Sequence, residues 1–353
     1  MNLATVGKIA KAVLYEGYML YPYRPSSVKN QQRWNFGVLC PPAYSEEQNG
    51  SDASAMQTEC LVEGSLLTAI EIRVRFLQLI ARFVGKPLQD DFVAGDTAEF
   101  RLVSRLEIGD RVYQPWQEAV EREIVLPVCN LETLGQSPMS HAFSFSTGKQ
   151  FEYLRNDAGS ITGVIIREQS EIHGEVNLNA ERVADELFKV TVRLRNSTPF
   201  SASLQQGSRD NALMSSLVST HTVLGVLDGK FASLLAPAEQ IVDLAASCKN
   251  VGTWPVLVGE EGDCDTLLSS PIILYDYPQI APESAGDLFD GTEIDEILSL
   301  RILTLTDDEK REMSQSDERA RQMLERTETM PVEHLMKLHG VLRGLHPLKE
   351  EAP

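Results

Sequence analysis

The sequence lacks the short motifs by which common catalytic and cofactor sites are recognised. It contains neither a GxxxxGK(S/T) loop nor a strand-linked GxGxxG, so a backbone cradle for nucleotide phosphates is not predicted. No GxSxG elbow marks a nucleophilic serine, and neither HxH nor HExxH marks a zinc site. The sequence therefore predicts no cofactor and favours a non-catalytic protein over an enzyme, a choice that it leaves open.

Cysteine is scarce and scattered. The chain has five cysteines with no CxxC pair among them, at Cys40, Cys60, Cys129, Cys248 and Cys264. This pattern is typical of reduced, mostly buried thiols in a cytosolic protein. The six histidines are equally dispersed. His221 stands among serines and threonines, and we expect a buried sheet histidine there in preference to a catalytic one.

Long apolar runs and positive charge are also lacking. No run of 18 or more apolar residues occurs, and Lys8 and Lys11 interrupt the apolar N-terminus. We therefore expect a cytoplasmic protein without membrane insertion. The net charge of -19 repels nucleic acid unless a local basic patch overrides it, so no nucleic-acid partner is expected.

Alternation of apolar and polar residues is what the chain has in abundance. Its 353 residues suffice for two domains, or for one large β-rich domain with appendages. Residues 69–76 and 187–200 alternate with period two, and turn residues separate further strands between 148 and 200. Strands at this spacing predict an antiparallel sandwich or curved sheets. The runs 77–85 and 210–227 fit either a strand or a helix.

Helical periodicity is concentrated near the chain ends. Apolar spacing of three and four residues predicts helices over 3–14, 237–252, 306–313 and 331–345. Thr306 and Glu309 form a capping-box pattern at the start of the third helix. Elsewhere, 33–42 is typical of a short strand and 46–55 of an exposed loop.

Together these patterns predict an α+β fold, predominantly antiparallel β, with a short N-terminal helix and a helical C-terminal appendage. We place a β-rich body at 1–284, with a sub-boundary near 130–150. An acidic helical segment follows at 285–353.

Residues 15–34, here called the aromatic–basic stretch, are rich in aromatic and positively charged residues although the chain as a whole is acidic. The stretch holds four of the nine tyrosines, one of the three tryptophans and three cations. It is interpreted as a structural clamp, as a protein interface or as a small-ligand site, because aromatic residues and arginine serve all three. Its cations could also pair with the acidic C-terminal segment. The residues predicted to bind a protein partner are Tyr18, Tyr21, Tyr23, Arg24, Lys29, Arg33 and Trp34.

Two acidic clusters give further hypotheses. Asp290, Glu293, Asp295 and Glu296 precede an apolar run and could form a docking face for a basic partner, or simply a solvated helix face. A second cluster, here called the acidic turn, could hold a metal if a histidine approached from elsewhere, and is otherwise a solvated turn. Its metal-ligand candidates are Glu260, Asp263, Cys264 and Asp265.

Four stretches carry a likeness to a known family: the run from YEGYMLYPYRP to LCPPAYS, TWPVLVG, the run from TLLSSPIILYDYPQIAPES to LTDDEK, and ERTETMPVEHLMKLHG. In these the chain resembles an uncharacterised bacterial family encoded beside the structural and maturation genes of nickel–iron uptake hydrogenases. The resemblance implies a cytoplasmic accessory role in assembly or maturation, with a hydrogenase subunit or maturation factor as partner. It transfers no catalytic residues. The alternative is a metal-handling protein or enzyme built on the acidic turn.

Overall fold

The structure is a computed structural model of the chain. It describes residues 3–20, 23, 24, 27, 30, 33–88, 100–200, 208–280, 295–316, 318–331 and 333. The fold is α+β and is dominated by antiparallel strands, as the sequence predicts. In the described part of the chain, twelve strands form one sheet.

Strand β1 (Ala55–Pro87) is the spine of this sheet and is 33 residues long. On one edge it pairs in succession with β11 (Leu187–Asn196), β6 (Cys129–Asn130), β5 (Trp116–Val125) and β2 (Phe100–Val103). On the other edge it pairs with β12 (Val218–Phe231) and β9 (Ile161–Gln169). The ambiguous run 77–85 is therefore strand, because both of its edges find partners.

The remaining strands extend the sheet outward from these partners. Its order runs β13 (Trp254–Leu257), β14 (Thr266–Ser270), β12, β1, β11, β10 (Ile172–Ala184) and β7 (Met139–Phe145). Strand β8 (Gly148–Arg155) pairs with β9. The short strands β3 (Leu106–Ile108) and β4 (Arg111–Tyr113) form a separate hairpin.

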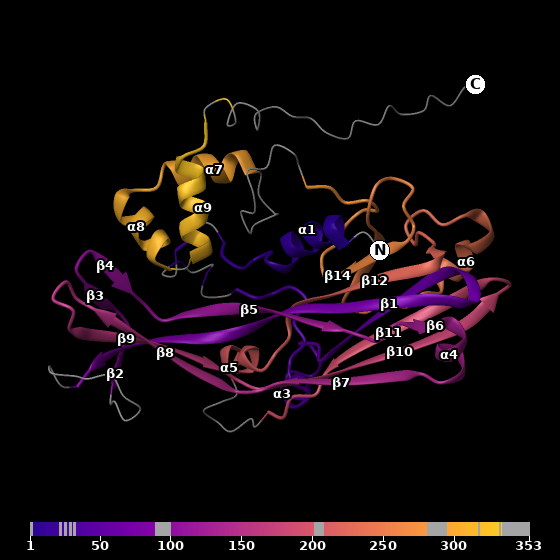
Figure 1. Cartoon of the computed structure of the whole chain (residues 1–353), viewed down its shortest axis with the longest axis horizontal. Coiled ribbons are helices and arrows are strands. Elements are labelled where there is room, and N and C mark those ends of the chain that lie inside the picture. Colours follow the sequence, from indigo (N-terminus) through magenta and orange to yellow (C-terminus); the bar gives the residue numbers. More distant parts are fainter. Residues whose placement is uncertain are drawn as a thin grey trace.

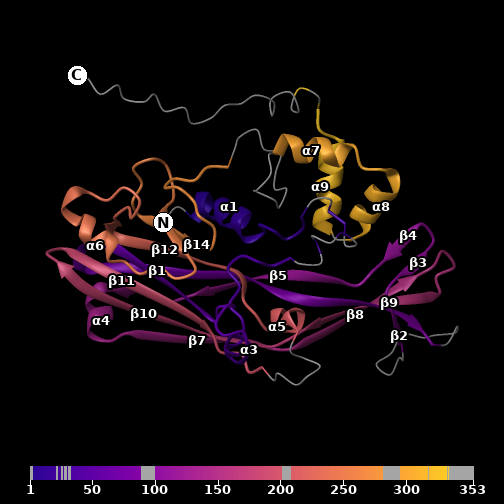
Figure 2. The ribbon, with the colours of Figure 1, turned by 180° about the vertical axis from the view of Figure 1, so that it is seen from behind.

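Helices cover the two sides of the sheet unequally. Helices α1 (Leu3–Leu14), α7 (Asp295–Leu303), α8 (Asp307–Ser316) and α9 (Glu318–Glu328) lie on one side (Figures 1 and 2). The short helices α3 (Pro42–Glu47), α4 (Leu131–Gln136) and α5 (Arg209–Met214) lie along the sheet, and η1 (Glu239–Ile241) continues into α6 (Val242–Ala246) near one end. Helices α7–α9 are here called the helical layer, and they share their side of the sheet with α1.

The interior consists chiefly of two hydrophobic clusters. The larger one contains Ile70, Ile72, Val74 and Phe76 of β1 together with apolar residues of β10, β11 and β12. The second joins Leu77 and Leu79 of β1 to the aromatic–basic stretch and the helical layer, through Tyr15, Tyr18, Trp34, Leu298, Ile302, Met313 and Met323. The C-terminal helices are thus tied to the sheet by a shared core.

Several local predictions are confirmed. Helix α1 has the predicted bounds, and α8 begins with the predicted capping box. There the Thr306 backbone N–H donates to Glu309 Oε2 at 2.9 Å, and the Glu309 N–H donates to Thr306 Oγ1 at 3.4 Å. The run 210–227 contains both of the predicted alternatives, since α5 precedes β12.

Other local predictions are wrong. Residues 33–42 form no strand beyond a single bridge from Leu39 to Leu217, because Pro41 and Pro42 lead directly into α3. That helix also takes up the first two residues of the loop predicted at 46–55. The helix predicted at 237–252 is confined to η1 and α6. Most of the helix predicted at 331–345 lies outside the described residues.

No helix in the described part of the chain is both long enough and apolar enough to cross a membrane. All five cysteines carry free thiols, and only Cys40 and Cys60 are buried. Burial raises the pKa of the Cys60 thiol, which disfavours the reactive thiolate.

Candidate functional site

Arg33 is the centre of the aromatic–basic stretch and is only 3% exposed. Its guanidinium carbon lies 3.6 Å from the centre of the Trp116 ring and 4.6 Å from that of Trp34. Its Nη1 donates to the Tyr18 carbonyl at 2.6 Å, and its Nη2 donates to the Gln117 carbonyl at 2.8 Å. Cation–π contacts and carbonyl acceptors compensate the cation for its loss of water.

Other described aromatic side chains of the stretch are also turned inward. Tyr18, Tyr23 and Trp34 are buried, and Trp34 Nε1 donates to Gln117 Oε1 at 3.0 Å. Among the predicted protein-binding residues, Tyr21 and Lys29 lie outside the described residues. The buried side chains serve as a structural clamp between the N-terminal segment and the sheet, so they offer no surface to another protein.

One partly exposed cation of the stretch, Arg24, has an internal partner. Arg24 forms an ion pair with Glu309 of α8, with 3.2 Å between its Nη1 and Oε1. In a second contact, a cation of the helical layer meets an aromatic residue of the stretch. The Arg319 guanidinium carbon lies 4.2 Å from the centre of the Tyr15 ring, and Arg319 Nη2 donates to the Tyr15 hydroxyl. The predicted pairing between the basic stretch and the C-terminal segment is therefore made within the chain.

The structure describes only part of the predicted acidic docking face. Asp290 and Glu293 lie outside the described residues. Asp295 and Glu296 form the start of α7, but their side chains lie outside the described set. The predicted docking face at these four residues stays a prediction.

The acidic turn is organised by its own backbone. Asp263 Oδ2 accepts from the Glu260 N–H at 2.9 Å, and Asp265 Oδ1 accepts from the Thr266 hydroxyl at 2.6 Å. Cys264 Sγ lies 3.9 Å from the Tyr277 hydroxyl. Across the described ranges, no group of three or more His, Cys, Asp or Glu side chains is placed to hold a metal ion.

His221 lies in β12 and is fully buried, as expected for a sheet histidine. Its Nδ1 is 3.0 Å from the Ser219 carbonyl. Burial lowers the pKa of His221 to about 4, and the charge of Arg75 on the adjacent strand adds to this effect. The imidazole is therefore neutral at pH 7.

A cavity of about 580 Å³ lies between the helical layer and the sheet. Five arginines line it, from β1, β4, β9 and α9: Arg82, Arg111, Arg167, Arg319 and Arg321. Glu118 of β5 and Glu318 of α9 are the acidic lining residues. Four of these arginines are held in ion pairs: Arg82 and Arg167 pair with Glu118, Arg319 pairs with Glu121, and Arg321 pairs with Glu318.

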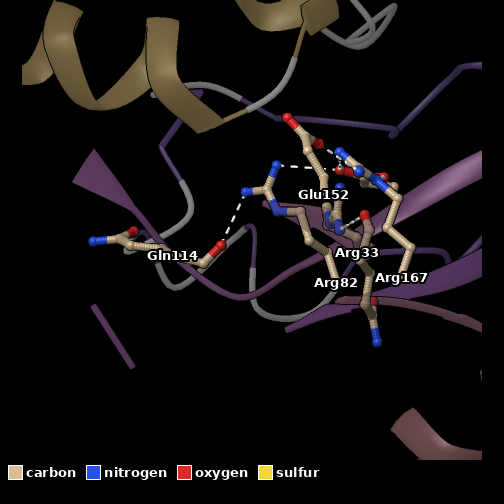
Figure 3. A network of polar contacts seen from close by, with 7 residues as sticks. Arg33, Arg82, Gln114, Glu152 and Arg167 are labelled. Atoms are coloured by element: carbon tan, nitrogen blue, oxygen red, sulfur yellow. Dashed lines mark hydrogen bonds and ion pairs between the residues drawn. The ribbon is translucent and has the colours of Figure 1, made fainter. Parts of the chain in front are cut away.

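Two of these arginines are fastened to the sheet by a polar network (Figure 3). Glu118 accepts from Arg82 Nη1 at 3.2 Å and from Arg167 Nε at 2.7 Å. Arg82 Nη2 also donates to the Gln114 carbonyl at 3.0 Å, and Arg167 Nη1 donates to Glu152 at 2.7 Å. Burial acts to lower the pKa of Arg167, but hydrogen bonds to Glu118 and Glu152 outweigh it and raise that pKa.

A second surface, here called the apolar edge, lies at strand β13. The segment after β14 turns back along β13, where Leu257 N–H donates to Asp276 and its carbonyl accepts from the Tyr277 N–H. Alternate residues of this returning segment, Ile272 and Leu274, pack inward. The outward side chains complete the apolar edge, which comprises Trp254, Ile273, Tyr275 and Ile280.

Sequence reasoning found neither surface. The cavity arginines come from segments far apart in the chain, so no local pattern joins them. One signal was present, because Arg82 stands inside the apolar run 77–85, where a charged side chain requires a partner. For the apolar edge, the signal was the unbroken apolar run 272–275. A strand that buries only one face requires an apolar residue at every second position, so the run also places apolar side chains on the other face.

Comparison of the sequence with models of protein families and with curated proteins gives no match.

Proposed function

We propose that the protein is a non-catalytic accessory protein that acts by binding another protein through the apolar edge. The observation that carries this proposal is the exposure of large apolar side chains at that edge. Tyr275 is 86% exposed, Ile273 70% and Trp254 44%. Ile273 and Tyr275 alternate with the inward-packed Ile272 and Leu274, so they stand on the same exposed side of the segment. Exposed apolar side chains grouped in this way mark interaction sites, and tryptophan and tyrosine are frequent among the residues that dominate binding energy.

The surroundings of the apolar edge indicate the character of the partner. The acidic turn adjoins it through the contact of Cys264 with Tyr277, and Glu260, Glu261 and Asp263 are exposed there. An apolar centre with an acidic rim fits a partner surface that is apolar with a basic rim, since complementary charge steers association and suppresses wrong partners.

The family resemblance supports a specific class of partner. By that resemblance, the partner is a hydrogenase subunit or a maturation factor, and the encounter takes place in the cytoplasm during assembly or maturation. This part of the proposal rests on likeness in sequence, whereas the binding surface rests on the exposed residues.

Affinity purification of the tagged protein from its native host tests both parts. We expect a hydrogenase subunit or maturation factor in the eluate, identified by mass spectrometry. The double variant Ile273→Glu/Tyr275→Glu should recover at least tenfold less of it, because two charges would be buried without partners at the contact. The matched control is Leu102→Glu/Phe151→Glu, which changes two exposed apolar residues of β2 and β8.

All three proteins should melt at similar temperatures, because the altered side chains are exposed. Equal recovery by the edge variant and the control would refute the assignment of the apolar edge. Recovery that depends on the edge, but of a protein unrelated to hydrogenases, would refute the partner class alone.

A further inference from the structure

Strand β7 lies at one end of the strand order, where its outer edge meets no other strand of the described part of the chain. The opposite end of that order is β13, whose outer edge is closed by the returning segment through Asp276 and Tyr277. Strand β7 pairs there only with β10, and it forms the lower margin of the sheet in Figure 1. An edge strand of this kind presents N–H and C=O groups to which another strand can pair.

This edge continues from β7 into β8, and its two halves differ in charge. The two strands run in one direction with the same register against β10 and β9. Strand β8 carries Lys149, Glu152 and Arg155, whereas residues 137–148 include no Lys, Arg, Asp or Glu. Charged side chains on an edge strand, lysine above all, protect it against pairing with another chain. The β7 half of the edge lacks that protection.

The side chains of β7 favour the approach of a second strand. The face exposed to solvent carries only two serines and Ala142, which are small. On the other face, Met139, Phe143 and Phe145 pack against the larger hydrophobic cluster but are only partly buried. A strand added at this edge would cover them further, and burial of apolar surface is the dominant driving force for most protein association.

We propose that β7 pairs with β7 of a second copy of this chain, antiparallel and about a two-fold axis at Ala142. A two-fold interface requires a self-complementary surface, and this axis gives every residue of β7 a partner. Ala142 faces its own copy, Ser140 faces Ser144, His141 faces Phe143, and Met139 faces Phe145. Methionine attracts aromatic rings, and facing side chains stabilise paired strands. The inference does not depend on the proposed protein partner, because β7 and β13 lie at opposite ends of the strand order.

The net charge of -19 on each copy opposes association in general, but the contact itself avoids repulsion. Glu175 of β10 stands beside Ala142, where it accepts from Ser140 Oγ at 2.5 Å and pairs with Arg195 at 3.8 Å. In the joined sheet the two copies of Glu175 lie three strand spacings apart, about 14 Å. That separation exceeds the Debye length of about 8 Å at physiological salt, so their repulsion is largely screened.

Sedimentation velocity of the full chain at physiological salt tests the proposal. We expect dimers with a Kd on the order of 10 µM, because one short strand pair is a small interface. Ala142→Lys should raise that Kd at least tenfold, since two like charges then face each other at the axis. The matched control Gln150→Lys adds the same charge at an exposed position of β8 and should leave Kd unchanged. A wild type that stays monomeric at about 200 µM, or an equal Kd for the wild type and Ala142→Lys, would overturn the proposal.

Cysteine cross-linking then tests the position of the axis. Oxidation with copper phenanthroline should link two copies of Ala142→Cys, because facing residues of paired strands have Cβ atoms about 5 Å apart. Ser144→Cys should link at least tenfold less, since the two introduced thiols would lie about 14 Å apart along the strands. Both variants alter an exposed side chain of β7, so the fold should not change. Equal linking of both variants, or no linking above the wild-type level, would overturn the pairing about Ala142.

Discussion

One buried side chain, His221, should make the fold weaker in acid. Its ordinary pKa is 6.5, and in the folded protein burial lowers that pKa to about 4. Between these values the unfolded chain binds a proton at His221 that the folded chain does not bind. Above pH 6.5 the neutral His221 therefore costs the fold nothing. As the pH drops from 6.5 toward 4, the free energy of unfolding decreases.

The magnitude follows from the two pKa values. Each unit by which the pKa differs between the folded and unfolded states corresponds to about 1.4 kcal/mol. Across the interval from 6.5 to about 4, His221 should remove about 3 kcal/mol of unfolding free energy. That is a large part of the unfolding free energy of a typical folded domain, which is on the order of 10 kcal/mol.

Urea denaturation at a series of pH values measures this contribution. His221→Leu removes the titrating group at nearly constant volume, so its curve of unfolding free energy against pH should be flatter than that of the wild type. The difference in slope should reach about 1.4 kcal/mol per pH unit near pH 5. Thr222→Val, a buried non-titrating change in the same strand, should shift the curve without altering its slope. Parallel curves for the wild type and His221→Leu would show that His221 does not cause the loss of stability in acid.

Three further stability predictions follow from the packing. Trp34→Ala removes a buried ring that stacks on Arg33, and should cost about 3–5 kcal/mol in denaturant titrations; a loss no larger than that of the partly exposed Phe36→Ala would contradict the clamp. Thr306→Ala opens the capping box of α8 and should cost about 1 kcal/mol, whereas an unchanged melting temperature would show that the cap contributes nothing. Gly174→Ala places a methyl group against the Phe143 ring and should cost about 1–3 kcal/mol; a stabilised variant would contradict this close packing.

Much of the fold could be predicted from the sequence because local patterns determine it. The alternation at 69–76 and 187–200 identifies strands, and the capping box identifies the start of α8. Local pattern cannot give the 33-residue length of β1, since its second half is strand only because β5 and β9 hold its two edges. Nor can it separate a sandwich from one 12-stranded sheet, because that choice depends on pairings between distant segments.

The aromatic–basic stretch shows the same limit for function. Its composition suits an interface, a ligand site and a clamp equally well, because aromatic residues and arginine are favourable in all three. Burial decides between them, and burial depends on Trp116 and Gln117, which lie about eighty residues away in the sequence. The cavity arginines are harder still to foresee, since they come from strands and a helix that meet only in the folded chain.

Binding of a partner protein at the apolar edge can be measured directly. The most direct test is the Kd between the purified protein and the purified hydrogenase subunit or maturation factor that it recovers, measured by biolayer interferometry. We expect Ile273→Glu/Tyr275→Glu to raise that Kd at least tenfold, while Leu102→Glu/Phe151→Glu leaves it unchanged. The same Kd for the wild type and both variants would contradict the claim.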